Sequence, residues 1–109
     1  MAEFLSATKK LMDDGERAEL VDYLACNPTA GDVIPGAGGV RKLRWGLEGR
    51  GKRGGARVIF FFHDMDMPLY LMTAYAKNER ENVSQAEINT LQKLARALVE
   101  TNRKRRLAP

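Results

Sequence analysis

The sequence predicts one small α+β domain, in which three strands form an antiparallel sheet that follows two short helices and precedes one long helix. Three observations predict this class. Apolar residues recur at helical spacing near both ends of the chain, whereas shorter apolar or alternating segments fill its middle. The connections between the predicted strands are too short for a crossover helix, which favours an antiparallel meander. The 109 residues can bury one core without disulfides, since Cys26 is the only cysteine, so we expect a single domain over residues 1–109.

Two short helices are expected at the N-terminal end. The first spans residues 3–12 and ends at Asp13-Asp14-Gly15, where Asp14 can cap a second helix over residues 16–26. Apolar spacing predicts the inner stripe of the second helix, namely Ala18, Val21, Leu24 and Ala25. Asn27-Pro28 ends this helix, and the glycines of residues 29–39 predict a loop.

The first predicted strand covers residues 40–45. Its side chains alternate, with Leu43 and Trp45 on one face and Lys42 and Arg44 on the other. This pattern is typical of a strand that buries one face.

Two further strands and a long helix complete the fold. Residues 57–64 are nearly all apolar, which predicts a central strand covered on both faces, and residues 69–76 form the third strand after a tight connection at 65–68. The residues Ser84-Gln85-Ala86-Glu87 are a capping box that opens the last helix. Its apolar face consists of Ile88, Leu91, Leu94, Ala95 and Leu98. The basic residues in 103–109 are expected to form a solvated tail.

The net charge of +4 is distributed unevenly. Residues 1–38 carry −4, residues 39–57 carry +6 and residues 58–109 carry +2. A concentrated basic segment indicates an anionic partner, most often nucleic acid, although a solvated basic face would have the same composition. No apolar run is long enough to cross a membrane and no signal segment is evident, so we expect a cytoplasmic protein.

Residues 49–57 combine four cations with glycines and lead into the apolar central strand. Glycine leaves the backbone accessible, so amides and cations can approach a polyanion together. Gly46 to Lys52 fits Gly-x4-Gly-Lys and residues 49–54 fit Gly-x-Gly-x-x-Gly, two nucleotide-binding patterns. Both patterns need a helix next, and a strand follows here. We therefore predict a clamp on a nucleic-acid backbone and reject a nucleotide loop.

Arg57 is the strongest candidate for a catalytic group. It begins a hydrophobic strand, where a cation needs a carboxylate or a ligand beside it, although an arginine at a strand end can also reach water. The meander places Arg57 at the same end of the sheet as Arg44, residues 46–55 and residues 75–79. His63, the only histidine, lies six residues along the strand, about 20 Å away at ~3.3 Å per residue. A reaction at Arg57 would have to proceed without it.

The residues after the third strand are the expected partners of Arg57. Tyr75, Lys77 and Glu79 alternate, so they point the same way if the strand continues. The hairpin register decides whether Arg57 shares their face. Tyr75 and Trp45 could stack on unpaired bases or belong to the core.

Several segments together resemble the HigB-like branch of the RelE/ParE toxin superfamily. The similar segments are Asn27-Pro28, residues 31–45, residues 49–59 and Tyr75-Ala76-Lys77-Asn78-Glu79. The resemblance implies a RelE-like toxin, neutralised by a cognate antitoxin, that enters the ribosomal A site and cuts mRNA without metal or cofactor. Members usually begin with a β-strand, for which Met1-Ala2-Glu3 leaves no room, so we expect a sheet of three strands unless a strand comes from elsewhere.

The resemblance also assigns roles to residues. Arg57 would match the strand arginine that stabilises the transition state, Lys52, Arg53 and Lys77 would match cationic groups, and Glu79 belongs to the Lys-Asn-Glu segment of the branch. We hypothesise that Arg57 stabilises charge while Lys77 or Glu79 transfers protons during attack by a 2′-hydroxyl. The residues expected to bind RNA are Arg44, Arg50, Lys52, Arg53, Tyr75 and Arg80. Two other functions stay open: a nucleic-acid or ribosome binder that cuts nothing, and a ParE-type inhibitor of DNA gyrase.

Overall fold

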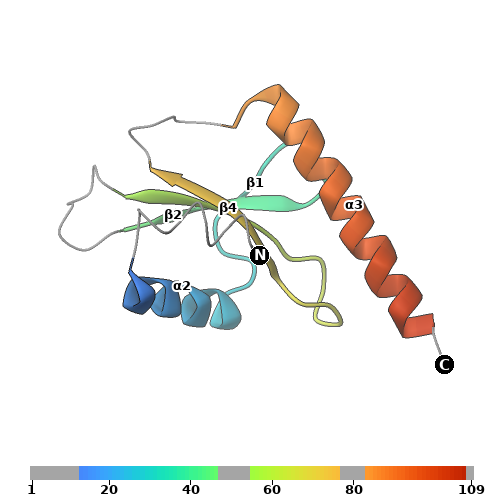
Figure 1. The fold of residues 1–109 in the computed structure, drawn as a ribbon, viewed down its shortest axis with the longest axis horizontal. Coiled ribbons are helices and arrows are strands. Elements are labelled where there is room, and N and C mark those ends of the chain that lie inside the picture. Colours follow the sequence, from blue (N-terminus) through green and yellow to red (C-terminus); the bar gives the residue numbers. More distant parts are fainter. Residues whose placement is uncertain (1–12, 47–54, 77–82, 108–109) are drawn as a thin grey trace.

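The computed structural model describes residues 13–46, 55–76 and 83–107. In chain order these residues form α2 (Asp14–Cys26), β1 (Asp32–Val33), β2 (Val40–Trp45), β3 (Ala56–Phe61), β4 (Tyr70–Ala76) and α3 (Gln85–Leu107) (Figure 1). The fold is α+β, as predicted, with a long helix at the C-terminal end. The first predicted helix, residues 3–12, lies outside the described residues. Within the described ranges, every helix falls short of the length and apolarity needed to cross a membrane.

The sheet has four strands rather than the three predicted. Their order is β1-β2-β3-β4, and all neighbours are antiparallel. The additional strand, β1, lies in the segment predicted to be a loop and pairs Asp32 with Lys42. Gly31 permits this pairing, because its φ is +77° and a Cβ there would lie 2.4 Å from the carbonyl oxygen of Lys42. Glycine spacing in the sequence does not reveal such a backbone contact, which is why the prediction missed β1.

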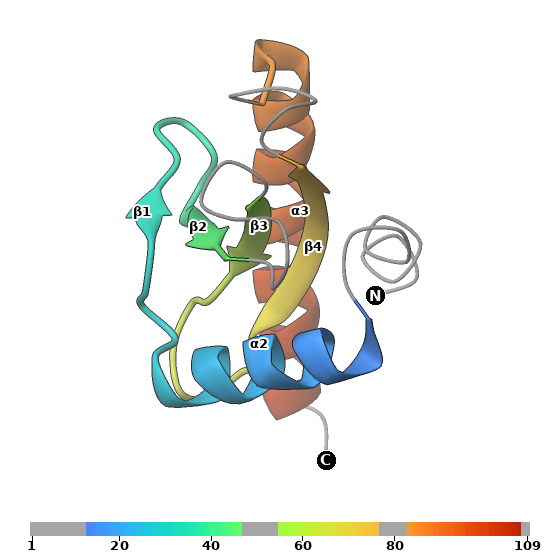
Figure 2. The same cartoon turned by 90° about the vertical axis from the view of Figure 1, so that its left-hand side faces the viewer.

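β3 is the central strand, and its two faces belong to two different cores, as its apolar composition predicted. The core on the α2 side includes Leu20, Leu24, Leu43, Val58 and Phe60. The core on the α3 side includes Val40, Ile59, Phe61, Leu91 and Ala95. The two helices therefore cover opposite faces of the sheet (Figure 2). Because side chains alternate along a strand, Arg57 belongs to the α3 side with Ile59. β3 ends at Phe61, three residues before the predicted end.

The N-cap of α2 is Asp13 and not Asp14. The Asp13 side chain accepts a hydrogen bond from the amide of Glu16 at 2.7 Å, and the Glu16 side chain accepts one from the amide of Asp13 at 3.0 Å. This reciprocal capping box satisfies two amides at once. The helix therefore begins two residues earlier than predicted.

The buried side of α2 also differs from the predicted stripe. Of the predicted stripe, Leu24 is buried as expected, at 2% exposed, whereas Val21 is 49% exposed; Leu20, which was not predicted, is 0% exposed. The other two predicted positions, Ala18 and Ala25, are exposed as well. Apolar residues occur on two sides of this helix, so spacing alone does not select one. The leucines face the sheet because their larger side chains bury more apolar surface.

α3 begins as predicted and ends later than predicted. The Ser84 amide donates to Oε1 of Glu87 and the Glu87 amide donates to Oγ of Ser84, both at 3.2 Å, so the capping box is confirmed. The helix continues to residue 107, and the basic residues in 103–107 are therefore helical. Asn102 supports these last turns: it is 8% exposed, and its amide donates to the Tyr70 hydroxyl of β4 at 3.1 Å.

Candidate active site at one end of the sheet

Arg57 lies near the start of β3, directly opposite Arg44 of β2 and Tyr75 of β4. Residues directly opposite each other in antiparallel strands point to the same face of a sheet. These three side chains therefore share the α3 side of the sheet. The register that the sequence left open places Arg57 and Tyr75 together.

The guanidinium group of Arg57 is buried without a carboxylate partner among the described residues. Its side chain is 8% exposed. Its Nη1 donates to the carbonyl oxygen of Ala56 at 3.5 Å, which is long for a hydrogen bond. The ion pairs in the described ranges are Arg17 with Asp14 and His63 with Asp64. No carboxylate from residues 13–46, 55–76 or 83–107 offsets the cost of burying this charge, so a bound anion would be stabilised here.

Arg44 places a second guanidinium group opposite the first. It is exposed, whereas Arg57 is buried. Like charges directly opposite on a sheet repel each other, and two forked cations on one face suit a phosphate group. Lys42 is half-buried on the same face, two residues before Arg44. The predicted site omitted Lys42, although its alternation with Arg44 could have indicated it.

Six of the nine predicted site residues lie outside the described residues, namely Arg50, Lys52, Arg53, Lys77, Glu79 and Arg80. The ends of the strands show where the segments that contain these six residues join the sheet. Trp45 ends β2, Ala56 begins β3 and Ala76 ends β4, and these three residues are register partners. Both segments therefore join the sheet one position from Arg57 (Figure 1).

Compared with known protein families, the sequence matches the family model described as the RelE toxin of the RelE/RelB toxin–antitoxin system over residues 9–108. The chain belongs to the RelE toxin family. This match spans all six described helices and strands and confirms the toxin superfamily that the sequence segments indicated. A RelE toxin acts within a toxin–antitoxin system, so an antitoxin is a partner of this chain.

Of the two aromatic residues considered for base stacking in this RelE toxin, Tyr75 is buried and Trp45 is half-buried. Tyr75 is 3% exposed and belongs to the core on the α3 side. Trp45 lies on the opposite face, where its ring centroid is 5.4 Å from that of Tyr23 on α2. A stacking contact of Tyr75 with RNA would require this buried ring to become accessible. Tyr75 is the register partner of Arg57 on β4.

His63 follows the opposite end of β3, two residues beyond Phe61. Its Nε2 lies 3.6 Å from Oδ2 of Asp64. Since the toxin has no other histidine, no imidazole stands beside Arg57. In the described ranges, no group of three His, Cys, Asp or Glu side chains could hold a metal ion.

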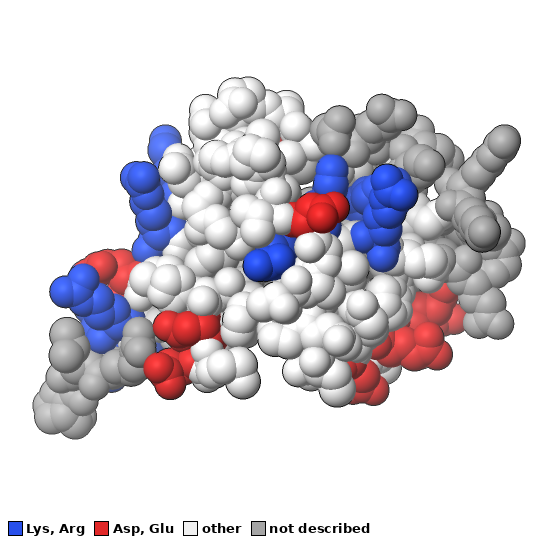
Figure 3. All heavy atoms as spheres, turned by 180° about the vertical axis from the view of Figure 1, so that it is seen from behind, with Lys and Arg blue, Asp and Glu red and all other residues white. Residues whose placement is uncertain are grey.

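The surface charge of the RelE toxin is unevenly distributed. From behind, basic side chains gather at the end of the sheet, with an acidic side chain among them, and again along α3, while acidic side chains lie over α2 and also beside the basic ones on the α3 side (Figure 3). The acidic residues of α2 and its cap are Asp13, Asp14, Glu16, Glu19 and Asp22. A polyanion is therefore attracted to the Arg57 end of the sheet and repelled from α2.

Proposed function

We propose that this RelE toxin is a ribosome-dependent endoribonuclease that cuts mRNA and thereby stops translation. The observation that supports this most directly is the Arg44–Arg57 pair: two arginines opposite each other, the second buried and without a carboxylate among the described residues. Cations that must stabilise charge on a substrate phosphate are expected to lack a neutralising partner in the free protein. The position of Arg57 on the central strand would hold it in place before substrate arrives.

The proposed reaction is attack of a 2′-hydroxyl on the adjacent phosphorus. The new O–P bond forms as the bond to the 5′-oxygen breaks, which gives a 2′,3′-cyclic phosphate and a free 5′-hydroxyl. The step needs a base for the 2′-hydroxyl proton, cations for the phosphoryl oxygens and an acid for the leaving oxygen. Arg57 stabilises the phosphoryl charge. Lys77 and Glu79, one and three residues beyond the end of β4, exchange the protons.

The remaining cations hold the RNA. Arg44 is exposed beside Arg57 and would contact a neighbouring phosphate. The other proposed backbone contacts are Arg50, Lys52, Arg53 and Arg80. Contacts of this kind neutralise phosphates without reading bases, so the sheet end would grip RNA in a sequence-independent way.

Mapping of mRNA 5′ ends after induced expression tests the proposal. The parent should give cuts at fixed codon positions together with growth arrest. Arg57→Ala should lower the cleavage rate by about 10²–10³ and relieve the arrest, since removal of one charge-stabilising donor typically has this effect. Arg57→Lys keeps the positive charge but loses the bidentate guanidinium group, so its cleavage rate should lie between those of the parent and Arg57→Ala. Arg96→Ala, which removes an exposed cation from α3, is the matched control and should arrest growth like the parent. Full arrest by Arg57→Ala at equal levels of folded protein would contradict the role.

The same experiment separates the rival functions. Growth arrest with ribosome binding and intact mRNA would identify a binder without catalysis. A DNA-damage response with intact mRNA would identify a gyrase inhibitor. The basic glycine-rich residues 49–57 favour RNA as the target. Together with Lys77-Asn78-Glu79, they also support our proposal of the HigB-like branch.

A further inference from the structure

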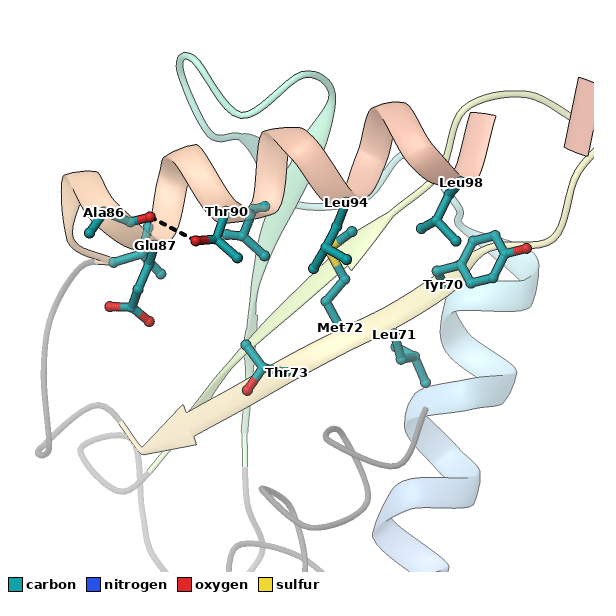
Figure 4. A pocket seen from close by; sticks show the side chains of 11 residues that line it. Tyr70, Leu71, Met72, Thr73, Ala86, Glu87, Thr90, Leu94 and Leu98 are labelled. Carbon is teal, nitrogen blue, oxygen red and sulfur yellow. Dashed lines mark hydrogen bonds between the residues drawn. The ribbon is translucent and has the colours of Figure 1, made fainter. Parts of the chain in front are cut away.

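An apolar groove of about 390 Å³ lies between β4 and α3 and does not include Arg57. Met72 of β4 and Leu94 of α3 point toward each other across it, and Tyr70 and Leu98 lie at one end (Figure 4). Leu94 is 46% exposed. A large, partly exposed apolar side chain in a concave apolar surface is typical of a binding site.

The groove is continuous with an open sheet edge. β4 is the last strand of the order β1-β2-β3-β4, so within the described residues no strand pairs with its outer edge. Residues 70–73 of this strand also line the groove. The unpaired amides and carbonyls of an edge strand are a template for a strand from another chain. A segment that pairs with β4 would have its alternate side chains directed toward Leu94.

The charges around the groove indicate the chemistry of its occupant. α3 carries six Lys and Arg residues against two Glu. Glu87 lines the groove near the start of the helix. Arg105 is exposed and lies seven residues, or about two turns, beyond Leu98, so it continues the groove-facing stripe. A complementary segment is therefore apolar at alternate positions and acidic where it passes the end of α3.

We propose that the antitoxin of this chain binds here, through an extended acidic and apolar segment that adds to the outer edge of β4 as a strand. Its apolar side chains fill the groove against Leu94 and Met72, and its acidic side chains face Arg105. This inference uses the antitoxin partner that the family match gives and does not depend on nuclease activity.

Binding of the cognate antitoxin, defined as the protein that relieves the growth arrest, tests this surface. Leu94→Glu places a charge in the groove and should weaken binding at least 30-fold, which is about 2 kcal/mol at 1.4 kcal/mol per tenfold. Val21→Glu is the matched control: it changes a helical side chain of similar exposure, 49% against 46%, on the opposite layer of the fold. Its affinity should equal that of the parent. Arg105→Glu should also weaken binding, and high salt should abolish its effect.

A second variant and a second measurement guard against a folding defect in Leu94→Glu. Thr90 is exposed and lines the groove, so Thr90→Trp fills the groove without adding charge and should also block binding. Hydrogen exchange should show new protection of outward-facing β4 amides when the antitoxin binds. The Leu94→Glu chain should still arrest growth and should escape neutralisation.

Three outcomes would overturn the proposal. Unchanged antitoxin affinity in Leu94→Glu and Thr90→Trp would place the antitoxin on another surface. Protection of the β4 amides that rises with toxin concentration, together with a dimer mass, would make a second copy the occupant. The same protection in the free monomer at every concentration would mean that a segment of the chain itself covers the edge. If the parent protein shows no nuclease activity, by contrast, only the proposed function is overturned.

Discussion

Arg44 and Arg57 should repel each other across β2 and β3, so replacing either arginine is expected to stabilise the fold. Their Cα atoms are register partners, and side chains of such pairs start about 5 Å apart at Cβ. For two charges about 8 Å apart, Coulomb's law gives ~0.5 kcal/mol in water and ~2 kcal/mol at an effective dielectric constant of about 20. Because Arg44 is exposed and Arg57 is buried, we expect a repulsion of about 1 kcal/mol, between these limits.

A double-mutant cycle measures this term directly. Urea unfolding is compared for the parent, Arg44→Gln, Arg57→Gln and the double variant. With a urea dependence of about 2 kcal/mol per molar, each single variant should unfold at a midpoint raised by about 0.5 M. Removing either arginine already relieves the repulsion, so the double variant should be little more stable than each single variant. The cycle should therefore give a coupling free energy of about 1 kcal/mol. Salt at about 1 M shortens the screening length to about 3 Å and should reduce the coupling.

The control cycle combines Arg41→Gln with Arg57→Gln. Arg41 precedes Lys42 on β2 and points to the other face, where its Nη1 donates to the carbonyl oxygen of Thr29 at 3.0 Å. Its free-energy change should add to that of Arg57→Gln within about 0.5 kcal/mol. A coupling between Arg44 and Arg57 that is absent or attractive at low salt would refute the reasoning. It would mean that the charges point apart or that an anionic group already lies between them.

Two further predictions concern the fold. Asp13→Ala should cost about 1 kcal/mol of unfolding free energy, because it removes the N-cap of α2. Asp14→Ala loses only an exposed ion pair with Arg17 and should cost less. Equal losses of stability for the two variants in urea unfolding would contradict the role of Asp13 as the cap. Gly31→Ala should destabilise more than Gly36→Ala by thermal unfolding, although the two φ values are +77° and +78°. The added Cβ would meet a backbone oxygen at 2.4 Å in the first case and nothing closer than 3.8 Å in the second, so equal losses would show that φ strain alone decides.

Local signals in the sequence were sufficient for most of the fold. Alternation in residues 40–45 predicted both the strand and its two faces, and the capping box at Ser84 and Glu87 predicted the start of α3. These signals work because each depends on neighbours in the chain. The apolar run from residue 58 identified the central strand for the same reason.

The errors share a physical cause, since each depends on contacts between distant residues. β1 exists because the backbone at Gly31 approaches Lys42, eleven positions away. The basic end of α3 stays helical where Asn102 reaches Tyr70, thirty-two positions away. The inward face of α2 was decided by the sheet beneath it and not by its own spacing.

In the candidate site, too, local signals were sufficient for some predictions, while others depended on contacts between distant residues. Chemistry alone selected Arg57, because a cation in an apolar strand is unusual wherever the strand lies. It could not distinguish an aromatic ring in the core from one at the surface, so the burial of Tyr75 became evident only in the structure. The opposition of Arg44 and Arg57 required a register, which the sequence does not contain.

The two proposed surfaces of this RelE toxin can be separated by experiment because β4 lies between them. Arg57 stands on β3, and a strand added outside β4 would run two strand spacings away, or about 10 Å. An antitoxin bound there would not have to touch Arg57 to neutralise the toxin. Its bulk would keep the sheet end out of a confined site on the target. It follows that Arg57→Ala should lose toxicity and keep the antitoxin, whereas Leu94→Glu should keep toxicity and lose the antitoxin. If either variant loses both toxicity and antitoxin binding, the sheet end and the groove are one surface.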